Sequence, residues 1–307
     1  MFINFSHSST VFCVCLAAHV IQRISTDVPV IGVTSVDDEL FALLARYDNQ
    51  VAVCSIADYQ LLRHLHLPGH VIFRYGDMTS CVHNKRLYIS DPSNSCVRRF
   101  DLSDKGSAIK RWMTGRHGRW SVQGSPWGLS VTPSSNLLVT CWIAQKGVEL
   151  GADDGQCAHN KLIELSADSG QCVREVTLQS DIQYPHHAVQ LTTGQLVVCH
   201  GDENDDLHRV CVVDVEGKVT CSYGGQRGSD VGQLDSPVHL AVDEQSQFIF
   251  VADKKNNRVV MLSPTLQFIR YISKELSGPY RLYFHQTTRR LYVGQQRGGI
   301  GLTVLQL

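Results

Sequence analysis

The chain has 307 residues and a net charge of −1 at pH 7, so no global basic field directs it to nucleic acid or to an anionic membrane. Hydrophobic residues make up 43% of the sequence, which is enough for a large core. No apolar run approaches the ~20 residues that a helix needs to cross a bilayer.

The first apolar stretch, VFCVCLAAHV at Val11–Val20, is short and apolar like the core of a signal peptide. No Lys or Arg precedes it, although a signal peptide normally begins with basic residues. A cleaved signal stays an alternative, but a cytoplasmic protein is the favoured interpretation. Residues 1–17 are then an N-terminal extension, and residues 18–307 form a single domain.

One local pattern recurs six times: an apolar run, a polar turn and a second apolar run. Each copy predicts a β-hairpin, because the runs are rich in β-branched and aromatic residues and the turns are polar. The copies are Leu40–Val53, Arg86–Phe100, Asn136–Leu165, Gln195–Val213, Phe248–Leu262 and Arg290–Leu305. Asp37–Tyr47 also has helix-forming residues, but its gapless alignment with the fifth copy favours a strand.

The copies follow one another at a regular spacing of 42 to 59 residues, measured between equivalent apolar positions. Those positions are Leu43, Ile89, Val139, Val198, Val251 and Val293. A further apolar run, often opened by proline, precedes each hairpin, and another follows it. Four short antiparallel strands in six copies predict an all-β fold, a six-bladed β-propeller.

The sixth copy reaches Leu307 after only three strands. His19–Ser25 has strand character, and we expect it to supply the fourth strand of the last blade. Such pairing would close the ring and remove an exposed sheet edge.

Eleven cysteines are scattered along the chain without a CxxC pair. The odd number is unlike a disulfide framework, and zinc knuckles need paired ligands at short spacing. Reduced thiols packed in a cytosolic core are therefore the favoured interpretation.

The fifth copy carries a more specific pattern. Tyr223–Leu262 combines a glycine-spaced loop, a proline that opens a strand, then LAVD, VAD and NNRV. This stretch resembles an NHL repeat, and the second and sixth copies share part of it. The resemblance implies the propellers of tripartite-motif (TRIM-NHL) ubiquitin-ligase proteins, in which the propeller is a C-terminal module that recognises protein or RNA.

The chain departs from that family in one respect. It contains no RING or B-box zinc pattern and no coiled-coil heptads, so we do not expect it to act as a ligase by itself. It is either a fragment of a longer protein or a stand-alone propeller.

In a propeller, the loop between the second and third strands of a blade lies on the same face as the loop that enters the next blade. This loop-rich face collects both long insertions and the residues around each proline. Function usually resides in loops on a rigid scaffold. We therefore predict a non-enzymatic recognition module that binds a protein partner through this face. The family resemblance implies that this module is the substrate-recognition part of a ubiquitin-ligase-type protein.

Histidines near the channel mouth raise an enzymatic alternative. His187, His239 and Arg281 lie two residues after a proline, and His186 lies beside them. Imidazole is a common metal ligand, so a metal-dependent lyase or hydrolase with a site at the channel mouth is the second alternative. Hydrogen-bonded or partner-contacting histidines are the simpler explanation, and neither GxSxG nor HExxH occurs. We expect no catalytic residues, no cofactor and no metal.

Two charged groups have structural interpretations. Asp202–Asp206, DENDD, offers oxygen ligands but lacks the spacing and the glycine of a defined calcium loop, so a solvated acidic loop is favoured. Asp253 and Arg258 flank the turn of the fifth hairpin and are expected to pair across it, with a contribution under ~1 kcal/mol if the pair is exposed.

Single-stranded RNA is the alternative partner. On the predicted loop-rich face, acidic residues gather in blades three and four (Glu149, Asp153, Asp154 and Asp202–Asp206), and basic residues gather in blades five, six and one. Basic side chains interleaved with aromatic ones are typical of RNA recognition. The residues predicted to contact protein or RNA are Arg46, Tyr47, His187, His239, Lys254, Lys255, Tyr280, Arg281 and Arg297.

Overall fold

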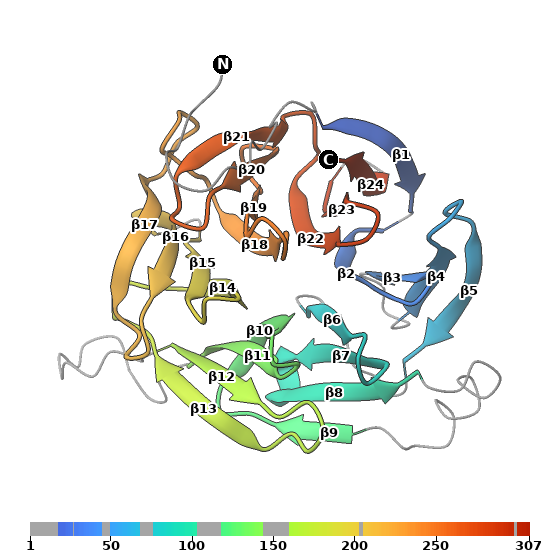
Figure 1. The fold of residues 1–307 in the computed structure, drawn as a ribbon, viewed down its shortest axis with the longest axis horizontal. Helices are drawn as coiled ribbons and strands as arrows, with labels where there is room; N and C mark the ends of the chain where they lie inside the picture. The colour runs from blue at the N-terminus through green and yellow to red at the C-terminus, as the bar shows by residue number, and fades with distance from the viewer. Residues whose placement is uncertain are drawn as a thin grey trace, which may run out of the picture.

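The computed structural model describes residues 18–26, 28–44, 50–67, 76–102, 118–143, 160–202, 205–297 and 300–307. Figure 1 shows these residues as a ring of six sheets around a central axis, each sheet with four antiparallel strands. Apart from one turn of 3-10 helix, η1 (Pro92–Asn94), the described elements are all strands. The structure confirms the predicted all-β, six-bladed β-propeller.

The first three blades follow the chain without interruption. Blade 1 contains β2 (Val30–Val36), β3 (Glu39–Leu44), β4 (Gln50–Ser55) and β5 (Leu61–His66). Blade 2 contains β6 (Met78–Cys81), β7 (Arg86–Asp91), β8 (Cys96–Asp101) and β9 (Gly118–Ser121). Blade 3 contains β10 (Ser125–Val131), β11 (Leu137–Trp142), β12 (Lys161–Leu165) and β13 (Cys172–Thr177).

The next two blades repeat this order, and the last one differs. Blade 4 contains β14 (Pro185–Gln190), β15 (Leu196–His200), β16 (Leu207–Val213) and β17 (Val219–Gln226). Blade 5 contains β18 (Pro237–Val242), β19 (Ile249–Asp253), β20 (Arg258–Leu262) and β21 (Phe268–Ser273). Blade 6 contains β22 (Pro279–His285), β23 (Arg290–Gln295), β24 (Ile300–Gln306) and β1 (His19–Ser25).

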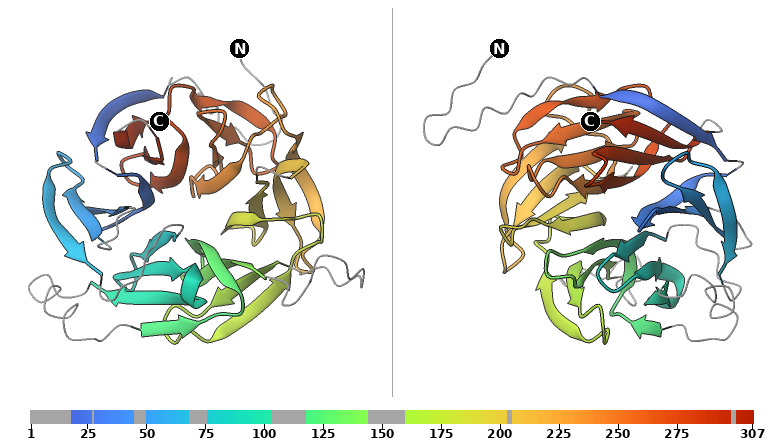
Figure 2. Two further views of the ribbon diagram at one scale, coloured as in Figure 1. Left: turned by 180° about the vertical axis from the view of Figure 1, so that it is seen from behind. Right: turned by 45° about the vertical axis from the view of Figure 1, so that its right-hand side comes forward.

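The first strand among the described residues therefore completes the last blade. β1 pairs antiparallel with β24, from His19 opposite Gln306 to Ser25 opposite Ile300. Figure 2 shows the same contact from behind, with the blue strand lying against the red strands. This arrangement confirms the predicted closure by His19–Ser25.

Burial follows the position of a strand within its blade. Middle strands such as β19 and β20 are buried along their whole length, because neighbouring blades cover both faces. The outermost strands, such as β13, are largely exposed, with few buried positions. This explains why continuous apolar runs predicted the hairpins of the blades.

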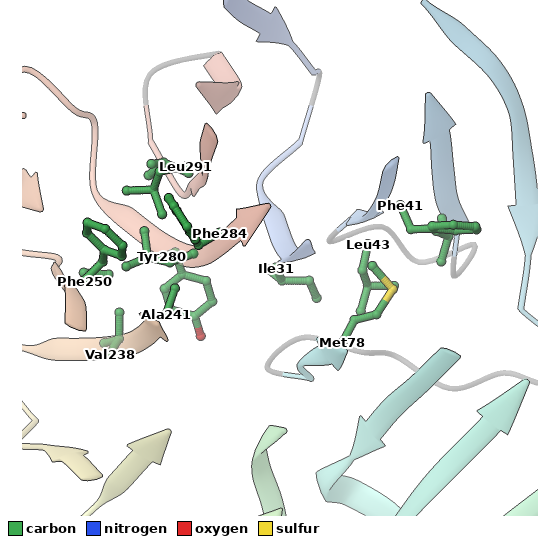
Figure 3. Close-up of a cluster of buried hydrophobic side chains, with 14 of the residues drawn as sticks. Ile31, Phe41, Leu43, Met78, Val238, Ala241, Phe250, Tyr280, Phe284 and Leu291 are labelled. Carbon is green, nitrogen blue, oxygen red and sulfur yellow. The ribbon is translucent and has the colours of Figure 1, made fainter. Parts of the chain in front are cut away.

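The first blade shows one departure from the predicted alignment. Leu43 packs with Met78 and Ile89 of blade 2, as Figure 3 shows for Leu43 and Met78. Val251, with which it was aligned, packs toward the preceding blade instead. A shift of one residue turns a strand side chain to the opposite face, so Ala42, which packs toward blade 6, is the true equivalent of Val251.

The helix-forming stretch at Asp37–Tyr47 forms the strand β3 over Glu39–Leu44. No helix in the described part of the chain has the length and apolar character to cross a membrane. The eight described cysteines are all free thiols, and burial raises the pKa of Cys141, Cys199 and Cys211 to about 12. Such thiols are chemically inert core residues.

Candidate functional site

A β-bulge near the start of the inner strand decides which side chains face the channel. The register of β18 shifts between Pro237 and His239, and matching shifts occur in β2, β10, β14 and β22. A bulge re-aims the side chains next to it. The residues at this level of the six inner strands, here called the channel ring, are Gly32, Asp77, Gly128, His187, His239 and Arg281.

Asp77 is the centre of a polar network in the channel ring. Its Oδ1 atom lies 3.0 Å from Nε of Arg281. Its Oδ2 atom lies 3.3 Å from Nε2 of His239 and 3.6 Å from Nε2 of His187. The two imidazoles stack with their centroids 3.7 Å apart. All four side chains are buried, so an ion pair and two histidines meet away from water.

Backbone groups add further hydrogen bonds to the network. The N–H groups of Met78 and Leu129 donate to the Asp77 carboxylate at 2.8 and 2.9 Å. The guanidinium of Arg281 donates to the carbonyl of Gly76. A buried ion pair is stable only when further hydrogen bonds satisfy its charged groups. Together these contacts join blades 2 to 6 near the axis.

The hydrogen bonds also fix the tautomers of the two histidines. Nε2 of His187 lies 3.0 Å from the carbonyl oxygen of Leu129, so it carries the proton and donates. Nδ1 of His239 accepts from the N–H of Leu282 at 3.3 Å, which leaves the proton on Nε2. Both nitrogens that face Asp77 are therefore donors without a lone pair to offer.

The charges of the network balance at neutral pH. Burial lowers the pKa of His187 well below its usual value and also lowers the pKa of His239. Burial acts to raise the pKa of Asp77, but the positive charge of Arg281 and the hydrogen bond from His239 outweigh burial and hold this pKa below its usual range. One carboxylate thus faces one guanidinium and two neutral imidazoles.

Within the described residues, Asp77, His187 and His239 form a group whose potential ligand atoms lie within 4.8 Å of one another. A metal there would have to displace the hydrogen bonds of both Nε2 atoms and compete with Arg281 for the carboxylate. The residues therefore fit a structural network better than a metal centre. His186, which the metal hypothesis also included, is not part of this group and packs against Trp142, with ring centroids 5.7 Å apart.

We expect purified protein that is incubated with excess zinc and then dialysed to retain much less than one equivalent. The reason is that each Nε2 atom that faces Asp77 would have to give up its proton and its hydrogen bond before it could bind. Elemental analysis measures the retained metal, and thermal unfolding with and without zinc gives a second readout, because a ligand of the folded state raises Tm. Stoichiometric zinc that is lost in Asp77→Asn would contradict this expectation.

Asp77 is the residue of the network that the sequence did not single out. No proline opens the inner strand of blade 2. Counting two residues from a proline, which located His187, His239 and Arg281, was therefore not possible there. A spacing signal was nevertheless present: Asp77 lies twelve residues before Ile89, the same distance that separates His239 from Val251 and Arg281 from Val293.

The channel contains a cavity of about 600 Å³ lined by residues of all six inner strands. It extends from His187 and His239 to the turns between first and second strands, where His83, Pro133, Thr192, Gln247 and Gln286 line it. These turns lie on the face opposite the loop-rich face. Part of the polar lining of the cavity is already paired, since the hydroxyl groups of Thr34 and Ser80 hydrogen-bond to each other at 2.6 Å.

The loops expected on one face do lie together. In blade 5, the amides of Lys254 and Lys255 donate to the carbonyls of Ser236 and Asp235, which join the turn after β19 to the loop before β18. In blade 6, the amide of Arg297 donates to Ser277 in the same way. In blades 5 and 6, these hydrogen bonds therefore join the loops of the loop-rich face to each other.

The predicted binding residues divide into three groups. Lys254, Lys255 and Arg297 lie on the loop-rich face, and Arg46 and Tyr47 lie outside the described residues. His187, His239 and Arg281 are buried in the channel ring, because the bulge turns them inward. Tyr280 is also buried, with Lys254 and Arg281 over its ring at 5.1 and 4.2 Å. Among the described residues, the basic surface that was expected over blades five and six is thus interrupted at Tyr280 and Arg281.

In the acidic loop at 202–206, one carboxylate is hydrogen-bonded within the loop itself. The Asp205 carboxylate accepts from the amide of Asp202 at 2.6 Å, and burial raises the pKa of Asp205. Asp206 is exposed. The other predicted acidic residues of this face lie outside the described residues, namely Glu149, Asp153, Asp154 and Glu203.

The predicted pair of Asp253 and Arg258 is confirmed, with Nε and Oδ2 2.7 Å apart. It is buried rather than exposed, so the small value expected for a surface pair does not apply. Asp253 also accepts from the amide of Asp235 and from Asn256, and Arg258 donates to the carbonyl of Gln233. The pair therefore holds the glycine-spaced loop of blade 5 against the hairpin turn.

Four aromatic side chains form a cluster where the loop-rich face crosses blades 3 and 4. The rings of Trp127 and Trp142 stack at 4.0 Å, and those of Tyr184 and His186 meet Trp142 edge-on at 5.1 and 5.7 Å. This set is called the aromatic cluster below. The sequence reasoning missed it, because Trp127 and His186 are bulge residues whose direction a strand pattern does not predict.

Comparisons with known proteins agree on the fold only. No family model and no curated sequence matches the chain. Hydrazine synthase of Kuenenia stuttgartiensis is similar in structure, with a TM-score of 0.60 at 12% identity over 94% of this chain and 98% of the other. A catalytically inactive virginiamycin B lyase of Staphylococcus aureus with quinupristin gives 0.60 at 11% identity over 94% and 99%. The β-propeller domain of Cps50 (Swd1) from Myceliophteria thermophila gives 0.54 at 11% identity over 90% and 82%.

Proposed function

We propose that this propeller is a non-enzymatic recognition module that binds a protein partner through its loop-rich face. The observation that carries this proposal is the aromatic cluster, in which Tyr184 is 44% exposed beside Trp142 and Trp127. Aromatic side chains held on a rigid scaffold are enriched among the residues that dominate protein interfaces. Propeller folds are also commonly used to bind proteins.

The channel ring supports the non-enzymatic part of the proposal. Its carboxylate, imidazoles and guanidinium are engaged with one another and with backbone groups. The resemblance to NHL repeats supports a finer version, in which the module selects substrates for a ubiquitin ligase. The free thiols of the described core support a cytoplasmic location.

The test is affinity capture with two matched double variants. Tyr184→Gly with Lys255→Glu alters the loop-rich face, and Val215→Glu with Lys218→Glu alters the opposite face; Tyr184 and Val215 are both exposed. We expect the first variant to recover bound proteins about tenfold less well than wild type, and the second to recover them equally well. Quantitative mass spectrometry of the retained proteins measures the difference.

Arg281 is not a suitable site for this test, because its charge is buried against Asp77 and a change there would disturb the fold. Equal recovery by all three proteins would count against binding through the loop-rich face. Greater loss in the Val215 and Lys218 variant would place the interface on the opposite face instead.

A further inference from the structure

Tyr184 has a backbone conformation that is unusual for its residue type. Its φ is +47°, in the left-handed region, directly before the proline that opens β14. The same position is occupied by Ser236 in blade 5 and by Gly278 in blade 6, which also have positive φ. This conformation is unfavourable for a bulky side chain and favourable for glycine. Blade 4 therefore carries a large aromatic residue where the architecture favours a small one.

The ring of Tyr184 is both exposed and fixed in place. It meets Trp142 at an interplanar angle of 78°, while the indole N–H of Trp142 donates to the carbonyl of Pro185 at 2.6 Å. Trp127 stacks on Trp142 from within blade 3. The result is a rigid, nearly perpendicular pair of rings, one of which remains accessible to a partner.

Negative charge lies close to these rings. His200 is the register partner of Pro185, so Asp202, two residues after His200, follows at the strand end beside Tyr184. Burial lowers the pKa of His186 to about 4, and the charge of Asp202 acts in the opposite direction. Asp206, on the same loop, is exposed.

Aromatic faces are electron-rich and attract cations, and a nearby carboxylate adds to this attraction. A neutral apolar side chain would use the rings but not the charge of Asp202. An acidic side chain or a phosphate would be repelled by it. The geometry points to the aromatic cluster as the anchor site for a cationic side chain, arginine or lysine, of the protein partner. This inference rests on the proposed function and gives it a defined chemistry.

The test is selection of a random peptide display library on immobilised protein. Four forms of the protein are compared: wild type, Tyr184→Phe, Tyr184→Gly and Asp202→Asn. We expect wild type and Tyr184→Phe to enrich peptides with arginine or lysine at one fixed position. Tyr184→Gly should lose most of this enrichment, and Asp202→Asn should weaken it. Replacing the enriched arginine by citrulline, which keeps the shape without the charge, should weaken binding at least tenfold.

Stability separates this role from a merely structural one. Because glycine suits the backbone of Tyr184, we expect Tyr184→Gly to change Tm by no more than about 2 °C. Selected peptides that depend on Tyr184 but show no basic preference would overturn the inference and leave protein binding intact. A library that yields no peptide above an unfolded-protein control would overturn both. A random single-stranded RNA pool is tested in parallel, and retention of RNA that requires Tyr184 would assign the aromatic cluster to bases instead.

Discussion

Replacement of Asp77 by Asn is expected to lower the free energy of unfolding by about 3–5 kcal/mol, because removal of one partner from a buried ion pair leaves the other charge uncompensated. Arg281 would keep its charge in a site that excludes water. The contacts that Asp77 makes join five blades. Unfolding should therefore stay cooperative, while the urea concentration at its midpoint falls. Urea denaturation followed by tryptophan fluorescence measures the change.

Two further variants define the origin of this loss. Asp77→Asn combined with Arg281→Met should recover part of the stability, because the double variant no longer buries an unpaired charge. Glu216→Gln removes a charge from a pair with Lys218 in which both side chains are 68% exposed, and it should cost less than about 1 kcal/mol. If Asp77→Asn is no more harmful than Glu216→Gln, the network does not stabilise the ring.

Stability is expected to fall steeply as the pH is lowered from 7 toward 5. Burial lowers the pKa of His200 to about 3, that of His187 well below its usual value and that of His239 as well. The unfolded chain binds protons at these histidines near pH 6.5, whereas the folded chain does not. Each one therefore removes roughly 1 kcal/mol for each pH unit below 6.5, and the full stability returns above this value.

Urea unfolding at pH 7.5, 6.5 and 5.5 measures this dependence. His200 provides a variant outside the channel ring, since its Nε2 accepts from Nε of Arg209 at 3.1 Å. His200→Gln should keep an acceptor there and reduce the slope of stability against pH by roughly a quarter, because His186, whose pKa is lowered to about 4, contributes to this slope as well. A free energy of unfolding that is constant between pH 7.5 and 5.5 would contradict the burial of three neutral histidines.

The architecture could be predicted because every blade repeats the same burial. The middle strands are covered on both faces, so their residues form continuous apolar runs at a regular period. The closing strand was predictable as well, because β22 to β24 need a fourth partner and His19–Ser25 has strand character. The pair of Asp253 and Arg258 followed from its position across one short turn.

The direction of individual side chains could not be predicted in the same way. A bulge one residue after the inner strand begins sends His186 and His187 to different surroundings, the first toward Trp142 and the second toward Asp77. The same bulge buries Arg281, which the sequence reasoning had placed on the surface. The predicted alignment of blade 1 was also wrong by one residue at Leu43. The length of the loop between β3 and β4 sets this register, and the sequence pattern did not show its effect.

The pairing of β1 with β24 has a consequence for biosynthesis. A ribosome makes His19–Ser25 first and their partner Ile300–Gln306 last. At typical elongation rates of about 5–20 residues per second, the two strands emerge on the order of 15–60 s apart. For that interval β1 has no sheet to join, whereas blades 1 to 5 can already form. The nascent chain therefore passes through an open arc with an unpaired β-edge, the kind of species that chaperones protect from aggregation.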